Sequence, residues 1–166
     1  MDIIYQPNLG LSINDATITW GMNRDQVREL LKVSFEEDNT TFDLSDLFDD
    51  EDDDFDFSQN RDIYSGLASA GDSIFLSYDK KNALTEFEMH EGIAVSIHDF
   101  RFYQDQPMHE IVTWFRQNNF NITQVEPGNF AVAELKISVA SHNAMGGQGD
   151  NLSYLYASND VSHLID

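Results

Sequence analysis

The sequence predicts an α+β fold in which a largely antiparallel sheet of about five to seven strands carries two main helices packed on one face. Runs of β-branched and aromatic residues alternate with turn residues, and two segments have helical apolar spacing. The hydrophobic fraction of 41% is enough to build a buried core. We therefore expect residues 1–166 to form a single domain.

The first predicted elements are a strand that closes at residues 17–20 and a short helix that begins after Asn23. Asn23 is a suitable N-cap because its side chain accepts a hydrogen bond from the first backbone N–H groups, and Gln26 stands at the third helical position. Apolar residues follow at helical spacing: Val27, Leu30 and Leu31. We expect this apolar stripe to pack on the sheet.

Residues 73–78 and 84–89 predict a β-hairpin, because both are rich in strand formers and residues 79–82 supply a turn. Ile93, Val95 and Ile97 then alternate with other residues. This alternation predicts a third antiparallel strand that runs to about Phe102 and completes a meander.

A second helix is predicted from Pro107, whose fixed backbone angle suits a first helical turn. Its apolar stripe consists of Met108, Ile111, Val112 and Phe115. Residues 120–125 and 130–140 predict a second hairpin with a long returning strand, and residues 152–156 predict a last strand. Helix followed by strands thus occurs twice, beginning near Asn23 and near Pro107, which predicts a two-part arrangement.

The acidic segment 36–62 is predicted to be a loop or insertion, and it holds thirteen of the thirty Asp and Glu residues against one base, Arg61. Such a block of like charges repels itself unless a cationic group meets it. Phenylalanine side chains interleaved with the acids supply apolar anchors. The candidate partner-binding residues are Asp49, Asp50, Glu51, Asp52, Asp53, Asp54 and Asp56, with Phe48, Phe55 and Phe57. The alternative is a solvated loop whose charge keeps the protein in solution.

The formal net charge of −21 constrains the class of partner. Nucleic acid and anionic membrane surfaces would be repelled, so we expect neither as a partner. A basic protein would be steered towards this chain, and such steering raises association rates by roughly 10- to 1,000-fold at low salt. The sequence leaves the oligomeric state open.

Catalytic, cofactor and metal motifs are absent from the sequence. The chain has no Cys, which removes disulfides and thiolate chemistry, and it has no Gly-x-Ser-x-Gly nucleophile elbow. The His-Glu pair at His109 lacks the second His of a zinc signature, because position 113 is Thr113. His90 and His98 are expected on exposed positions. We therefore expect no cofactor, no metal site and no enzymatic activity.

The beginning of the sequence has neither a basic region nor an apolar core of a secretory signal, so we expect a cytoplasmic location. Residues 21–31, Gly-Met-Asn-Arg-Asp-Gln-Val-Arg-Glu-Leu-Leu, resemble the helix opening of small bacterial helix-plus-sheet domains. These include the outer-membrane assembly lipoprotein BamE, the β-lactamase inhibitory protein group and small bacterial immunity proteins. The resemblance covers about eleven residues, and it implies a bacterial α+β interaction domain.

The charge and the resemblance together predict a non-enzymatic inhibitor of a basic protein, namely an immunity protein that neutralises a cognate toxin such as a nuclease. Carboxylates of residues 49–56 would pair with Lys and Arg of the toxin, while the phenylalanines fill apolar pockets. The alternative is an accessory or structural domain of a larger assembly with a solvating acidic loop.

Overall fold

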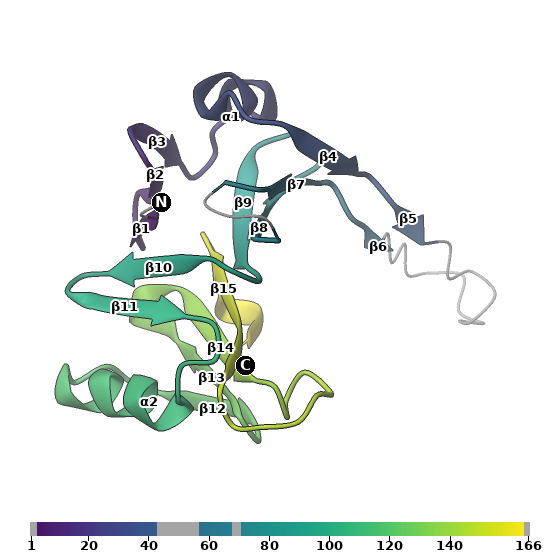
Figure 1. Ribbon diagram of the computed structural model, residues 1–166. Coiled ribbons are helices and arrows are strands. Elements are labelled where there is room, and N and C mark those ends of the chain that lie inside the picture. The colour runs from purple at the N-terminus through teal and green to yellow at the C-terminus, as the bar shows by residue number, and fades with distance from the viewer. Residues whose placement is uncertain (1–2, 43–56, 68–70, 165–166) are drawn as a thin grey trace.

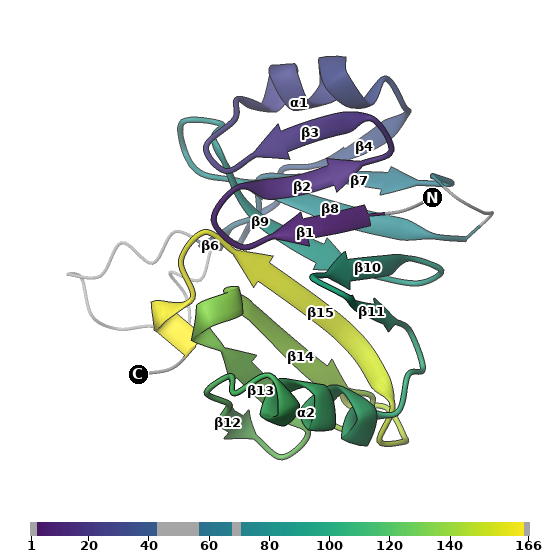
Figure 2. The ribbon, with the colours of Figure 1, turned by 90° about the vertical axis from the view of Figure 1, so that its left-hand side faces the viewer.

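The computed structural model describes residues 3–42, 57–67 and 71–164, and its two sheets form two layers (Figures 1 and 2). The helices are α1 (Arg24–Leu31) and α2 (Met108–Gln117), and two 3-10 turns are η1 (Ala133–Leu135) and η2 (Ser162–Leu164). The five-stranded sheet has the order β11 (Phe100–Tyr103), β10 (Ala94–Ile97), β1 (Ile3–Gln6), β2 (Gly10–Ile13) and β3 (Ala16–Thr19).

The eight-stranded sheet is antiparallel throughout. Its order is β12 (Thr123–Glu126), β13 (Asn129–Val132), β14 (Ile137–Ser141), β15 (Leu152–Ser158), β9 (Leu84–Met89), β8 (Ser73–Tyr78), β7 (Arg61–Ser65) and β4 (Phe35–Asp38). A separate two-stranded ribbon consists of β5 (Thr41–Phe42) and β6 (Phe57–Ser58). The α+β class, the two helices and the mostly antiparallel pairing are confirmed. The expected single sheet of five to seven strands is wrong, because the described chain forms sheets of five and eight strands.

The core lies between the two sheets, and the helices close its opposite ends (Figure 2). The five-stranded sheet contributes Ile3, Tyr5 and Leu11, and the eight-stranded sheet contributes Leu76 and Phe87, all at most 1% exposed. Each strand alternates its side chains, so one face of the eight-stranded sheet meets this core and the other, which we call the outer face, carries partly exposed side chains.

The predicted third strand of the meander is wrong. Residues 93–102 bend at His98, which has a φ of 53°, and form β10 and β11. Instead of pairing with β9, β10 pairs in parallel with β1, with Val95 opposite Ile3. Ile93, Val95 and Ile97 are all buried, so the buried face that the alternation predicts is confirmed. The pairing partner is β1, which lies far away in the sequence. Strand alternation specifies a buried face and does not specify the neighbouring strand.

The predicted long strand over residues 130–140 is also wrong, because the chain folds back on itself there. The 3-10 turn η1 and a left-handed Lys136, with φ of 53°, separate β13 from β14. These two strands pair antiparallel, with Val132 opposite Ile137. The hairpin of β8 and β9 and both predicted helices are confirmed, including Asn23, whose side chain caps α1 by accepting from the N–H of Asp25 at 3.0 Å.

The two-part arrangement is confirmed. With the β5–β6 ribbon left aside, the order β2, β3, α1, β4, β7, β8, β9 is followed by the equivalent order β10, β11, α2, β12, β13, β14, β15. The halves meet where β9 pairs with β15 (Figure 1). The residue before each helix makes the same contact: Asn23 forms a β-bridge with Ala83, and Pro107 forms one with Asn151. The eight-stranded sheet is therefore built from two equivalent four-stranded units.

Candidate functional site: the base of the acidic ribbon

The ribbon of β5 and β6 continues the β4–β7 pair beyond the edge of the eight-stranded sheet (Figure 1). We call it the acidic ribbon, because the acidic segment 43–56 connects its two strands in the sequence. Its last described pair is Phe42 opposite Phe57, so the residues that flank segment 43–56 lie side by side. Among the predicted partner-binding residues, Phe57 is placed in β6. The others lie outside the described residues: Asp49, Asp50, Glu51, Asp52, Asp53, Asp54, Asp56, Phe48 and Phe55.

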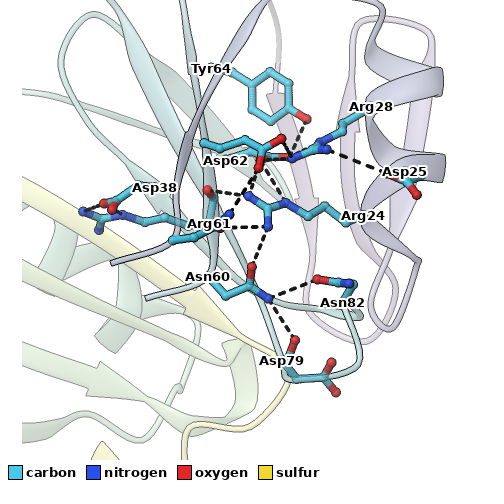
Figure 3. Close-up of polar contacts among 12 residues, drawn as sticks. Arg24, Asp25, Arg28, Asp38, Asn60, Arg61, Asp62, Tyr64, Asp79 and Asn82 are labelled. Atoms are coloured by element: carbon cyan, nitrogen blue, oxygen red, sulfur yellow. Dashed lines mark hydrogen bonds and ion pairs between the residues drawn. The ribbon is translucent and has the colours of Figure 1, made fainter. Parts of the chain in front are cut away.

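The base of the ribbon is held by Arg24, the first residue of α1 (Figure 3). Its guanidinium lies 2.6 Å from the carboxylate of Asp62 on β7, and the two side chains are 8% and 0% exposed. The same guanidinium donates to the side chain of Asn39, which follows β4, and to that of Asn60, which precedes β7. A single buried cation therefore joins both arms of the ribbon at the point where they leave the sheet.

Two further arginines hold the acids on either side of this pair (Figure 3). Arg28, one turn along α1, donates to Asp62 at 2.8 and 2.9 Å and forms an ion pair with Glu37 at 2.9 Å. On the outer face, Arg61 donates a hydrogen bond to the carboxylate of Asp38 at 2.8 Å and forms an ion pair with it. Three of the chain's nine basic residues are thus engaged with acids at the base of the ribbon.

These contacts lower the pKa of two carboxyl groups. Burial by itself raises the pKa of Asp62, but hydrogen bonds from Arg28 and Arg24 and their positive charge outweigh it, so the pKa lies below its ordinary value. The hydrogen bonds that Asp38 accepts from Thr40 and Arg61 likewise lower its pKa. Both groups therefore stay ionised at neutral pH, and the arginines balance their charge.

The second half of the molecule has apolar residues at the equivalent positions. Met108 is the first residue of α2 and is 2% exposed. Phe130 on β13 corresponds to Asp62 in the strand register, and it packs against the core. In the first half, Asp62 lies opposite Leu76, and Leu76 lies opposite Phe87. In the second half, Phe130 lies opposite Val139, and Val139 lies opposite Leu155. The ion pair thus belongs only to the half that carries the acidic ribbon.

The outer face of the eight-stranded sheet continues from this base across β8, β9 and β15. Tyr156 donates to Glu86 at 2.9 Å across the junction of the two halves. His90 stacks on Phe75 with ring centroids 3.9 Å apart and lies 3.1 Å from Glu88. Tyr154 and Tyr156 lie on the same face of β15, which lies inside the sheet and is not an edge strand.

Sequence reasoning missed Arg24, Arg28 and Asp62. One signal was available: Arg24 stands three residues before Val27, so it lies on the apolar stripe of its helix. A charged residue on a buried stripe requires a buried counter-charge. Nothing local points to Asp62 as that partner, because the two residues are 38 positions apart.

The other sequence-based site expectations concern exposed histidines, metal ligands and membrane contact. His98 is exposed, as expected, whereas His90 is only partly exposed on the outer face. Within the described ranges, no three His, Cys, Asp or Glu side chains gather as a metal site would require. No helix in this part of the chain has the length and apolar character needed to cross a membrane. No protein-family model, curated protein or solved structure matches this chain.

Proposed function

We propose that the protein is a non-enzymatic inhibitor of a basic protein, acting as an immunity protein against a cognate toxin such as a nuclease. The acidic segment 43–56, with nine Asp and Glu in fourteen positions, forms the binding surface. Its carboxylates pair with Lys and Arg of the toxin, and Phe48, Phe55 and Phe57 contribute apolar contacts. Inhibition occurs by occlusion, because the bound segment covers the cationic groove that the toxin uses for its own substrate.

The buried ion pair of Arg24 and Asp62 is the observation that supports this proposal most directly. Replacing a buried ion pair with well-packed apolar residues is often neutral or stabilising, and the second half shows that this fold accepts Met108 and Phe130 there. Stability alone therefore does not explain the pair. A base with a single geometry favours binding by the segment that it carries, because a surface that is ordered before the partner arrives loses less conformational entropy on binding.

The distribution of positive charge also supports an external partner. Three arginines form ion pairs within the protein: Arg24 and Arg28 with Asp62, Arg28 also with Glu37, and Arg61 with Asp38. These three acids account for most of the acidic residues of segment 36–62 that lie outside residues 43–56. Segment 43–56 itself contains no Lys or Arg. Its charge therefore attracts basic proteins over a Debye length.

The second candidate is an accessory domain of a larger assembly, in which the acidic segment only solvates the protein. The exposed edge of β4 favours it, since Phe35 on that edge strand is 38% exposed and the strand pairs only with β7 in the described chain. In that case a partner strand would add to β4, and the charge of residues 43–56 would be irrelevant to binding.

Affinity capture with two charge-matched variants tests the proposal. In the first variant Asp52, Asp53 and Asp54 are changed to Asn. The control variant carries Asp15→Asn, Asp99→Asn and Glu126→Gln, which change the net charge equally at exposed positions away from the ribbon. Each protein is immobilised and exposed to a lysate of its source organism, and proteins that elute with rising salt are identified and assayed.

We expect the wild type and the control to retain one basic protein that elutes only at high salt and whose activity is abolished by an equimolar amount of this protein. The segment variant should lose it. Equal retention by both variants would remove the acidic segment as the binding surface. Retention of an acidic assembly that is insensitive to salt would favour the accessory domain.

A further inference from the structure

A partly enclosed hollow of about 330 Å³ lies on the outer face of the eight-stranded sheet. Ser77 on β8 lies between Arg61 on β7 and Glu86 on β9, so a small side chain forms the floor and long side chains form the walls. Asn60 and Glu88 also line it. Because residues 59–60 connect β6 to β7, the hollow begins where the acidic ribbon leaves the sheet.

The cation beside the hollow, Arg61, has a counter-charge, whereas the carboxylates of Glu86 and Glu88 have no Lys or Arg partner in the described chain. Arg61 lies 2.8 Å from Asp38 and stacks over the ring of Phe75, so its positive charge is already balanced. In the described chain, Glu86 accepts from the phenol of Tyr156, and no Lys or Arg forms an ion pair with Glu86 or Glu88. A third lining carboxylate, that of Asp79, accepts the backbone N–H groups of Lys81 and Ala83, and Glu88 contacts His90 at 3.1 Å. Glu86 and Glu88 each keep acceptor capacity for an incoming cation, because a carboxylate can accept about four hydrogen bonds.

Aromatic rings surround the carboxylate of Glu88. The ring of His90 stacks on Phe75, and the ring of Tyr154 meets His90 edge to face at 5.8 Å. The side chain of Glu88 is 14% exposed and that of His90 is 30% exposed, so both are partly accessible to solvent. A guanidinium donates to carboxylates through a planar fork of N–H groups, so the neighbouring carboxylates of Glu86 and Glu88 favour arginine over the single charged head of lysine.

We infer that this hollow receives an arginine side chain of the basic partner, which makes the outer face of β7, β8 and β9 a second part of the binding surface. The inference rests on the proposed function for the class of partner. The volume lies at the low end of small-ligand sites, roughly 300 to 1,000 Å³, and suits one long side chain. Glu86 and Glu88 bind the guanidinium, and the hollow adjoins the acidic ribbon, so one partner can contact both.

An NMR titration of the full-length protein tests this inference without the natural partner. The probe is an acetylated and amidated Gly–Arg–Gly peptide, and the control peptide carries citrulline, a neutral isostere, in place of arginine. Backbone amide shifts are followed in the wild type, in Glu86→Gln/Glu88→Gln, and in Glu91→Gln/Glu110→Gln. The last variant has the same charge change at exposed positions away from the hollow.

We expect the arginine peptide to shift the amides of Ser77, Thr85, Glu86 and Glu88 in the wild type and in the Glu91/Glu110 variant. The citrulline peptide should leave them in place. Glu86→Gln/Glu88→Gln should weaken the affinity by about fivefold, as expected for partly exposed ion pairs. The glutamine at position 86 can still accept the hydrogen bond from Tyr156, and a wild-type-like spectrum of this variant shows that its fold is retained.

The outcomes separate this inference from the proposed function. If the arginine peptide shifts only amides of residues 43–56, the hollow is not a binding site, and the acidic segment remains the proposed surface. If the peptide shifts only the hollow, the inference holds and the role of the acidic segment is wrong. Equal shifts with arginine and citrulline, or no shifts at all, would overturn the inference.

Discussion

Arg24 and Asp62 form a buried ion pair at 2.6 Å, and in the equivalent half of the molecule the corresponding positions hold Met108 and Phe130. Two halves with the same order of strands and helices thus differ in the residues that fill two equivalent positions. The polar version occurs where the chain leaves the sheet to form the acidic ribbon. The difference identifies the base of the ribbon as a specialised part of the fold.

Asp62→Asn should destabilise the protein strongly. The substitution leaves Arg24 and Arg28 without a buried counter-charge, and breaking a buried pair in this way costs about 3–5 kcal/mol of unfolding free energy. Urea denaturation measures the change. Asp99→Asn, at an exposed turn, serves as the control and should change the unfolding free energy by less than about 0.5 kcal/mol. Similar values for the two variants would mean that the ion pair contributes little to the base of the ribbon.

Stability should also fall in acid because of Asp62. Its pKa is lower in the folded protein than in the unfolded chain, so its contribution is complete above the unfolded value of about 4 and is lost as the pH falls through the folded value. We expect the unfolding free energy of the wild type to decrease below about pH 4. The decrease should be smaller in Asp62→Asn, measured by denaturation across the same pH range. Parallel curves for the two proteins would exclude this assignment.

Tyrosine ionisation should be delayed in the folded protein. Burial raises the pKa of five of the six tyrosines, Tyr5, Tyr64, Tyr78, Tyr154 and Tyr156. A raised pKa stabilises the folded state below the unfolded value of about 10, and this contribution is lost as the pH rises above it. Absorbance at alkaline pH should show a minority of the phenols ionised before unfolding and all of them afterwards. Ionisation of all six near pH 10 in the folded protein would contradict this burial.

Replacing residues 43–56 with Asn-Gly should preserve the fold. Phe42 lies opposite Phe57, and a two-residue Asn-Gly turn joins such a pair in the twist that antiparallel strands favour. We expect the far-UV circular dichroism spectrum to show the same helix and strand content, and the unfolding free energy to lie within about 1 kcal/mol of the wild type. Loss of cooperative unfolding would show that the segment is needed for folding, whereas retained partner binding would contradict the proposed function.

The kinetics of partner binding should depend on the acidic segment. Changing Asp52, Asp53 and Asp54 to Asn weakens the field that steers a basic partner, so the association rate at low salt should fall by about tenfold and depend less on salt. The variant Asp15→Asn/Asp99→Asn/Glu126→Gln has the same net charge and should stay close to the wild type. Stopped-flow mixing at several salt concentrations measures both, and an unchanged rate in the segment variant would exclude steering by these residues.

The elements that could be predicted from the sequence are those specified by neighbouring residues. Asn23 caps α1 through a contact two positions away, and the residues between β8 and β9 form the turn of a local hairpin. Helical spacing from Met108 to Phe115 placed α2 for the same reason. Pairing between distant strands could not be predicted in this way. The alternation in residues 93–97 indicated a buried face, but β1 and β9 are equally acceptable partners for such a face.

The sequence by itself determined the fold class, the strong negative charge, the repeated order of helix and strands, and the density of acids in segment 43–56. Local spacing and composition carry this information. Only the tertiary structure decided that the two halves join into one eight-stranded sheet, that Arg24 meets Asp62 across 38 positions, and that Glu86 and Glu88 border a hollow beside the ribbon. These contacts depend on which distant segments pack together. The burial of apolar surface that drives this packing is non-directional, so local sequence does not specify which segments will meet.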